Sequence, residues 1–360
     1  MSPLPVDLGL IEGYYGRPWS WEARVRVVDR IATAGYRFHL YAPKAATFLR
    51  RAWRAPLTAS DLDPIAAHAA HCRSRGLRFG VGLSPVGIEG AFDRSDTALL
   101  IARIKTLRQA MGLDELALLF DDIRGDDPTL AVAQSDLVAA VLDATGGLPL
   151  VVCPTYYSDD PVLDRVFGMR PMGYLETLGR RLDASVRVFW TGEEVCSREH
   201  SARALGRVAE VLQRRPLLWD NYPVNDGARM SQVLHLRAFT GRPAALAPLL
   251  AGHAVNPALQ PELGCIPLLT LAARYREGDA AWAYGEALEA ACLEVTQDAA
   301  LSAALRSDLV RLQDTGLDRL GAMTTELRER YAAFDGPAAR EVVAWLDGAY
   351  RITDDEVQTQ

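Results

Sequence analysis

The sequence is poor in the features that mark several classes of protein. Its five cysteines are scattered, odd in number and never spaced as Cys-x-x-Cys, so neither a disulfide framework nor a structural zinc site is expected. No apolar run is long enough to cross a bilayer. The first residues show no basic segment followed by an apolar one. We therefore expect a cytoplasmic protein with no membrane partner.

Positive charge is also scarce. Lys and Arg together number 39 against 46 Asp and Glu, which gives a formal net charge of −7. This balance makes nucleic acid an unexpected partner. No Gly-x-Gly-x-x-Gly follows the first predicted strand, so the dinucleotide-binding fingerprint is missing. We expect neither a cofactor nor a metal.

Strand-like and helix-like segments alternate along most of the 360 residues. Eight strand-then-helix units in about 275 residues predict an α/β fold of the (β/α)8 TIM-barrel type. A doubly wound open sheet is the alternative, disfavoured because the fingerprint above is missing. The predicted strands are residues 8–15, 36–42, 77–83, 116–120, 148–153, 186–190, 216–219 and 253–255.

The composition changes after residue 278. The following residues are rich in Ala, Leu, Glu and Arg with helical periodicity and lack strand-like runs. We predict a catalytic barrel over residues 1–278 and a small α-helical domain of two or three helices over 279–360. The oligomeric state stays open.

The most informative stretch is the fourth predicted strand. Its five apolar residues end abruptly in two adjacent carboxylates, Asp121 and Asp122. Placing two acids where a buried strand emerges costs desolvation and like-charge repulsion. Paired carboxylates at the end of a barrel strand are typical of glycosidases. The alternative is a helix N-cap, because two more aspartates and a proline follow at 126–128.

Nearly every predicted strand ends in aromatic or hydrogen-bonding side chains, a profile that suits a sugar. Taken singly, Lys44 could be a loop cation, Asn256 a cap before a proline, and Trp219 part of the core. Independent structural accidents should not all favour one end of a barrel. The candidate site residues are Gly13, Lys44, Asp121, Asp122, Tyr157, Trp219, Asn221, Asp226 and Asn256.

The same segments give the chain a family resemblance. It resembles glycoside hydrolase family 84, the β-N-acetylglucosaminidases that include the O-GlcNAcases and some bacterial enzymes described as hyaluronidases. The block Ile-Glu-Gly-Tyr-Tyr-Gly-Arg-Pro-Trp and the surroundings of the paired aspartates carry most of its specificity. The matching segments are 11–19, 41–44, 118–123, 153–157, 190–192, 219–226 and 255–257.

The resemblance implies hydrolysis with retention and without an enzyme nucleophile. The 2-acetamido oxygen of the substrate attacks the anomeric carbon and forms an oxazoline, an exception to the two-carboxylate scheme. By position, Asp121 would orient the acetamido group and Asp122 would be the general acid and base. Tyr157 would bind the acetamido oxygen, while Asn221 and Trp219 would complete that pocket. Two adjacent carboxyls should titrate as a split pair.

The resemblance also implies the remaining sugar contacts. Asp226 would hold the outer hydroxyls O4 and O6, Asn256 a ring hydroxyl, and Gly13 and Lys44 the surroundings of O3. Family members often have acids after the lysine, whereas this chain has Ala45-Ala46. The expected partner is a GlcNAc-containing glycan or glycosylated protein. The alternatives are a non-catalytic GlcNAc-binding or sensing protein, and an enzyme acting on hyaluronan-type or cell-wall glycans.

Overall fold

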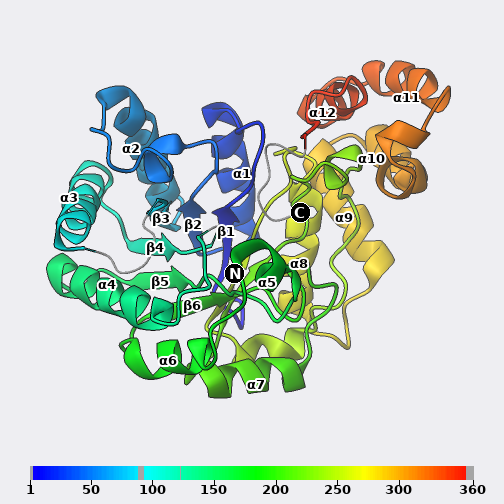
Figure 1. Ribbon diagram of the computed structural model, residues 1–360. Helices are drawn as coiled ribbons and strands as arrows, with labels where there is room; N and C mark the ends of the chain where they lie inside the picture. Colours follow the sequence, from blue (N-terminus) through cyan, green and yellow to red (C-terminus); the bar gives the residue numbers. More distant parts are fainter. Residues whose placement is uncertain (1–2, 88–92, 122, 354–360) are drawn as a thin grey trace.

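Eight parallel strands close into a barrel in sequence order, with β1 paired to both β2 and β8. The computed structural model describes residues 3–87, 93–121 and 123–353. The closed barrel confirms the predicted fold class and excludes the open sheet (Figure 1). The strands are β1 (Leu8–Glu12), β2 (Phe38–Tyr41), β3 (Arg78–Leu83), β4 (Glu115–Leu119), β5 (Leu150–Cys153), β6 (Arg187–Trp190), β7 (Leu217–Asp220) and β8 (Gly252–Val255).

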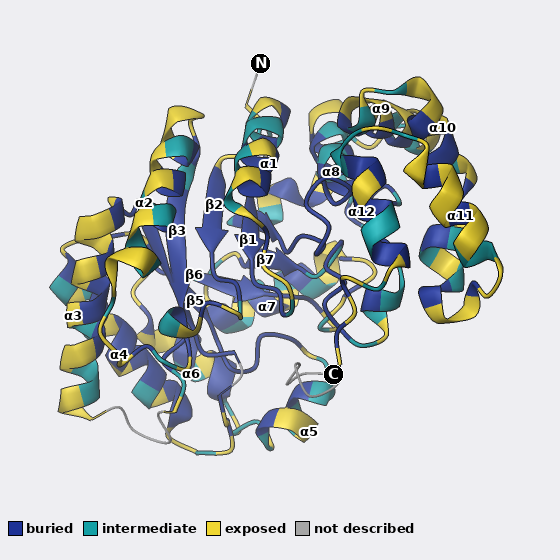
Figure 2. Ribbon diagram, turned by 90° about the horizontal axis from the view of Figure 1, so that it is seen from above, coloured by how far each residue is buried: buried dark blue, intermediate teal, exposed yellow. Residues whose placement is uncertain are grey.

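The strands are buried almost throughout, as Figure 2 shows by colour. This explains why their sequences read as nearly continuous apolar runs rather than alternating ones. The first strand is shorter than predicted, because its pairing with β2 ends at Glu12. The amide of Gly13 instead donates to the side chain of Asn256, 3.1 Å away. Residues 13–15 therefore belong to a loop above the barrel.

Helices surround the barrel and begin and end at recognisable signals. The Ser20 side chain accepts a hydrogen bond from the amide of Ala23 at the start of α1. Gly35 ends that helix with φ 103°, a conformation that favours glycine. Thr58 and Asp61 form a capping box at α2. These helices are α1 (Trp21–Ala34), α2 (Ala59–Ser74), α3 (Arg94–Met111), α4 (Leu130–Thr145), α5 (Val162–Phe167), α6 (Tyr174–Arg181), α7 (Ala202–Leu212) and α8 (Cys265–Glu277).

The seventh unit departs from the expected strand-then-helix pattern. Residues 221–251, all described, contain only the 3-10 helices η2 (Met230–Gln232) and η3 (Ala244–Leu249) between β7 and β8. Prolines recur in this stretch, and Pro248 lies inside η3 itself. Proline lacks the amide hydrogen that an α-helix needs, and its ring clashes with the preceding turn. The result is a long loop at the carboxyl end of β7.

The C-terminal part is helical as predicted, but its described residues, 279–353, hold four α-helices where two or three were expected. The first of them packs against α8, and the others extend outward from it at one edge of the barrel (Figure 1). A separate second domain stays a prediction. The elements are α9 (Tyr284–Thr296), α10 (Ala299–Ser307), the π-helix η4 (Val310–Thr315), the 3-10 helix η5 (Leu317–Arg319), α11 (Met323–Ala332) and α12 (Pro337–Leu346).

These C-terminal elements support the long loop after β7. The indole N–H of Trp345 donates to the carbonyl of Ser231 at 3.2 Å. The side-chain oxygen of Gln313 accepts from the amides of Leu236 and Arg237 at 2.8 and 2.9 Å. Because the same loop carries candidate site residues, the C-terminal helices contribute to its conformation.

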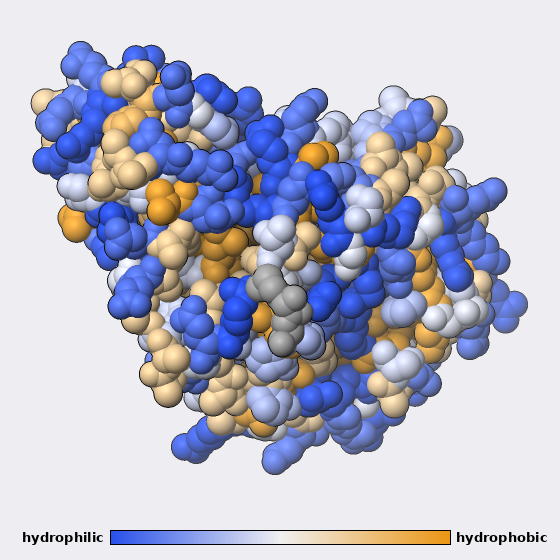
Figure 3. Space-filling view, turned by 180° about the vertical axis from the view of Figure 1, so that it is seen from behind, coloured by the Kyte–Doolittle hydropathy of each residue, from blue (hydrophilic) through white to orange (hydrophobic). Residues whose placement is uncertain are grey.

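The surface seen from behind is mainly hydrophilic, with hydrophobic side chains gathered in small patches (Figure 3). Across the described ranges, no helix combines the length and the apolar character that spanning a bilayer requires.

Candidate active site

A cavity of about 610 Å³ opens where the strands end at the carboxyl side of the barrel. This is the end at which barrel enzymes carry their active sites, and the volume suits a small ligand. Eight of the nine candidate residues line the cavity: Gly13, Lys44, Asp121, Tyr157, Trp219, Asn221, Asp226 and Asn256. The ninth, Asp122, lies outside the described residues.

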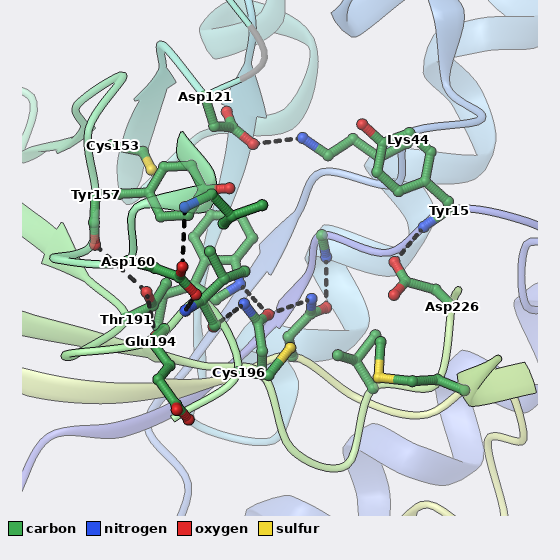
Figure 4. A pocket seen from close by; sticks show the side chains of 18 of the residues that line it. Tyr15, Lys44, Asp121, Cys153, Tyr157, Asp160, Thr191, Glu194, Cys196 and Asp226 are labelled. Carbon is green, nitrogen blue, oxygen red and sulfur yellow. Dashed lines mark hydrogen bonds and ion pairs between the residues drawn. The ribbon is translucent and has the colours of Figure 1, made fainter. Parts of the chain in front are cut away.

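Asp121 follows β4 and Lys44 follows β2, and their side chains point toward each other at the cavity wall (Figure 4). The lysine Nζ lies 2.5 Å from Oδ2 of Asp121. After β4, the Phe120 amide donates to the carbonyl of Cys153 at 2.9 Å, and after β2 the Lys44 amide donates to the carbonyl of Tyr14 at 3.0 Å. These backbone hydrogen bonds hold the main chain in place at Lys44 and next to Asp121. An ammonium group this close favours the ionised carboxylate.

A chain of amide hydrogen bonds joins the ends of β1, β7 and β8. The Gly13 amide donates to Asn256, whose side-chain nitrogen donates to Oδ1 of Asn221 at 3.0 Å. The Trp219 indole donates to the same oxygen at 3.0 Å. The Asn221 nitrogen donates to the Val195 carbonyl at 2.9 Å. Both asparagines are therefore held in one orientation at the cavity wall.

Residue 13 must be small because the Trp219 side chain occupies the space beside it. A Cβ atom at residue 13 would lie 2.2 Å from Cζ2 of the indole. Glycine allows other groups to approach the backbone closely, and at residue 13 the indole of Trp219 does so. The indole also packs edge-on against Phe189, with centroids 5.0 Å apart. Trp219 is thus both a cavity wall and a structural contact.

Tyr157 and Asp226 lie on opposite sides of the pocket in Figure 4. Oδ2 of Asp226 accepts from the amide of Tyr15 at 2.8 Å, which links the loops after β7 and β1. The carbonyl of Tyr157 accepts from the amide of Thr191 at 2.9 Å, which links the loops after β5 and β6. Each candidate is therefore held by a hydrogen bond to a loop that follows another strand.

Several other residues line the cavity, although the sequence predicted no sugar contact for them. Their common signal is position, because they lie at or after the ends of β1, β5, β6 and β7. Asp160 plainly serves the structure, since its carboxylate accepts from the amides of Val162 and Val195 at 2.9 and 3.2 Å. The additional lining residues are Tyr15, Cys153, Asp160, Val162, Arg165, Thr191, Glu194, Val195, Cys196, Arg198, Val224, Arg229 and Met230.

Asp220 forms a buried ionic cluster next to the cavity. Its two oxygens accept from Arg242 at 2.8 and 2.6 Å, and His253 Nε2 lies 3.0 Å from one of them. Burial alone would raise the pKa of Asp220, but Arg242 and His253 hold it well below its usual range. The cluster anchors the end of β7 immediately before Asn221.

Glu12 forms a second buried cluster at the end of β1. Its carboxylate accepts from Arg24 at 2.9 Å and from the hydroxyl of Tyr14 at 3.1 Å, and His39 Nε2 lies 3.0 Å away. Burial alone would raise the pKa of Glu12, but Arg24 and His39 hold it well below its usual range. This cluster anchors the strand end immediately before Gly13.

Comparison with known proteins gives a consistent result. A family model of β-N-acetylglucosaminidases matches residues 8–308. The protein O-GlcNAcases of Mus musculus and Rattus norvegicus are each 28% identical over 280 residues, which cover 74% of this chain and 30% of either relative. The chain thus matches less than a third of their length. A solved mutant O-GlcNAc hydrolase of Thermobaculum terrenum superposes with a TM-score of 0.79 at 27% identity, covering 95% of this chain and 80% of that one.

Proposed function

The chain belongs to the β-N-acetylglucosaminidase family, and on this premise we propose that it is a retaining, O-GlcNAcase-like glycoside hydrolase. It removes terminal β-linked GlcNAc through an oxazoline intermediate. The observation that carries the proposal is the convergence of eight candidate residues, from distant parts of the chain, on one cavity at the carboxyl end of the barrel.

In the first step the acetamido oxygen attacks the anomeric carbon and the glycosidic bond breaks. Asp121 accepts the acetamido N–H and stabilises the positive charge that develops on the oxazoline. The ion pair with Lys44 supports this assignment, because it favours the anionic form of Asp121. No covalent bond to the enzyme forms, and the anomeric configuration is retained after two inversions.

The proton is moved by Asp122. It protonates the departing glycosidic oxygen in the first step and then accepts a proton from the water that opens the oxazoline. Adjacent carboxyls in unlike surroundings supply one fixed anion and one proton carrier. The pairing of Asp121 with a lysine leaves the proton-carrying role to its neighbour.

The remaining cavity residues bind the sugar. Tyr157 donates to the acetamido oxygen, and Asn221 contacts the same group beside Trp219. Asp226 accepts from the outer hydroxyls, and Asn256 binds a ring hydroxyl. The hydrogen bonds that hold both asparagines support these roles, since fixed groups lose little entropy on binding.

A chromogenic β-GlcNAc glycoside tests the activity. We expect turnover, whereas a folded sample that is inactive at every pH would indicate a GlcNAc-binding protein instead. Progressive fluorination of the N-acetyl group tests substrate assistance, because it weakens the attacking oxygen. We expect kcat to fall steeply along the series; an enzyme nucleophile would make the dependence shallow.

The aglycone is tested by comparing glycosylated protein, chitobiose and muropeptide donors side by side. The mammalian relatives are named protein O-GlcNAcases, and we propose a GlcNAc-modified protein for this chain as well. The expected cytoplasmic location stays a prediction.

A further inference from the structure

Three potential metal ligands meet in the barrel wall, outside the proposed active site. His39 lies on β2, and His68 and Cys72 lie on α2; all three are buried and none lines the cavity. His68 Nε2 lies 3.1 Å from His39 Nδ1, and Cys72 Sγ lies 3.7 and 3.6 Å from those two nitrogens. We propose that these three atoms bind a thiophilic cation, either Zn²⁺ or Cu⁺.

The spacing of the three atoms fits such an ion. Tetrahedral Zn²⁺ with Zn–N near 2.0–2.1 Å and Zn–S near 2.3 Å places its ligand atoms about 3.3–3.6 Å apart. The observed separations run from 3.1 to 3.7 Å, so small shifts suffice. His68 and Cys72 are four residues apart on α2 and therefore share one helix face. The third ligand comes from the neighbouring strand.

A carboxylate orients the first ligand. His39 Nε2 lies 3.0 Å from Oε1 of Glu12, whose carboxylate also forms an ion pair with Arg24 and so accepts hydrogen bonds. Nε2 must therefore carry the proton, so the unprotonated Nδ1 faces His68 and Cys72. Metal-binding histidines commonly donate their second nitrogen to a carboxylate in this way. Arg24 neutralises Glu12, so the orienting charge is itself compensated.

A proton relay explains the cluster less well. The chain from Glu12 through His39 ends at His68, whose Nδ1 has no hydrogen-bond partner among the residues that the structure describes. A relay needs a continuation at that atom. Nor does the hydrogen bond between the two imidazoles account for Cys72, whose sulfur is about equally distant from both nitrogens.

The chemistry of the three ligands suits a soft cation. Each imidazole would bind through an unprotonated ring nitrogen. The Cys72 sulfur would bind as a thiolate, so its proton passes to solvent as the metal–sulfur bond forms. Cu⁺ bound to a thiolate adds no net charge to the buried site, whereas Zn²⁺ adds one.

Structural zinc was not expected from the sequence because no cysteine pair has the usual spacing. The cluster escapes that search since it combines His-x-x-x-Cys on a helix with one strand residue. The bound ion would fasten α2 to β2, whose end leads to Lys44.

The test is metal loading of the full chain. The protein is refolded under reducing conditions with excess Zn²⁺ or Cu⁺ and desalted, and its metal content and Tm are measured. We expect about one equivalent of one of the two ions per chain, with a raised Tm. A folded wild-type protein that retains neither ion would overturn the proposal.

Variants locate the site. Cys72→Ser and His68→Gln should each weaken binding by roughly ten-fold or more, while Cys292→Ala, which removes a buried thiol on α9, should not. With Co²⁺ as a probe, the thiolate-to-metal absorption should vanish in Cys72→Ser. Unchanged binding by both ligand variants, or loss in the Cys292 control alone, would refute the assignment.

Discussion

Two sets of carboxylates at the strand ends differ in what they face. Asp121 lines the cavity and is paired with a lysine. Glu12 and Asp220 are buried beside the cavity, and each is held by an arginine and a histidine. A carboxylate therefore faces the ligand cavity in one position and stabilises the end of a strand in the other.

The anchors also matter to the site, but indirectly. Glu12 precedes Gly13, and Asp220 precedes Asn221, and both of these neighbours line the cavity. A carboxylate locked by charged hydrogen bonds fixes the backbone at the residue before each contact. We expect changes to the anchors to act mainly on stability, and changes to the cavity carboxylates to act mainly on turnover.

The largest effect on stability is expected for Arg242→Met. Removing the arginine leaves the buried Asp220 with His253 and the more distant His200 as its neighbours, which should cost about 3–5 kcal/mol of the free energy of unfolding. Denaturant unfolding measures this cost. The matched control is Lys44→Met, which removes the cation facing a cavity carboxylate and should lower activity more than stability. Equal losses of stability in the two variants would remove the distinction between the two sets.

The next effect is expected from acid, which protonates Glu12 and Asp220. The folded pKa values of Glu12 and Asp220 lie below the unfolded values near 4. Their contribution to stability is therefore complete above about pH 4 and is lost as the pH falls through the folded values. The free energy of unfolding should drop steeply below pH 4, and less steeply in Asp220→Asn. An unchanged slope in that variant would contradict the assignment.

A smaller effect is expected for Gly13→Ala. The new methyl would lie 2.2 Å from the Trp219 ring, and such overpacking typically costs about 1–3 kcal/mol. Displacement of the indole should also raise KM. Gly206→Ala is the control, since a Cβ there meets no atom within 4 Å on helix α7; it should stabilise by about 0.5–1 kcal/mol. If both variants behave alike, the indole is not what requires glycine at residue 13.

The last effect concerns the C-terminal helices, where stability should change with pH in the opposite direction. Burial and then the nearby Glu262 carboxylate raise the pKa of Glu341 to about 8, although backbone amides of Glu262 and Leu263 lower it. Because the folded pKa exceeds the unfolded value near 4.3, stability is complete below that value and is lost as the pH rises toward 8. Tm should fall between about pH 4 and 8 in the wild type and change less in Glu341→Gln. An identical fall in both would exclude Glu341 as its cause.

The barrel and most of the cavity could be predicted from sequence because parallel strands place their carboxyl ends at one edge. The helix-cap alternative for the paired acids is wrong for Asp121. The turn before α4 is instead bound by Asp127, whose carboxylate accepts from the Thr129 amide at 2.8 Å. The strand reading was correct because a buried apolar run directly preceded the acids.

The features that sequence missed depend on contacts between distant segments. The partners of Asp220 are His253 on β8 and Arg242 in the loop before it. No local sequence pattern predicts that Arg242 binds this carboxylate. The helix expected after β7 is absent from residues 221–251, where C-terminal groups such as Gln313 bind the backbone instead. Such pairings are set by the folded topology and leave no periodic signal.

Asp121 and Asp122 should have different roles, Asp121 at the acetamido group and Asp122 in proton transfer. The difference is tested by comparing Asp121→Ala and Asp122→Ala on a GlcNAc glycoside with an activated leaving group and on one without. General acid assistance is typically worth about 10²–10⁴-fold. Loss of Asp122 should therefore spare the activated substrate and impair the ordinary one by that factor, while loss of Asp121 should impair both. The reverse pattern would show that the two roles are exchanged.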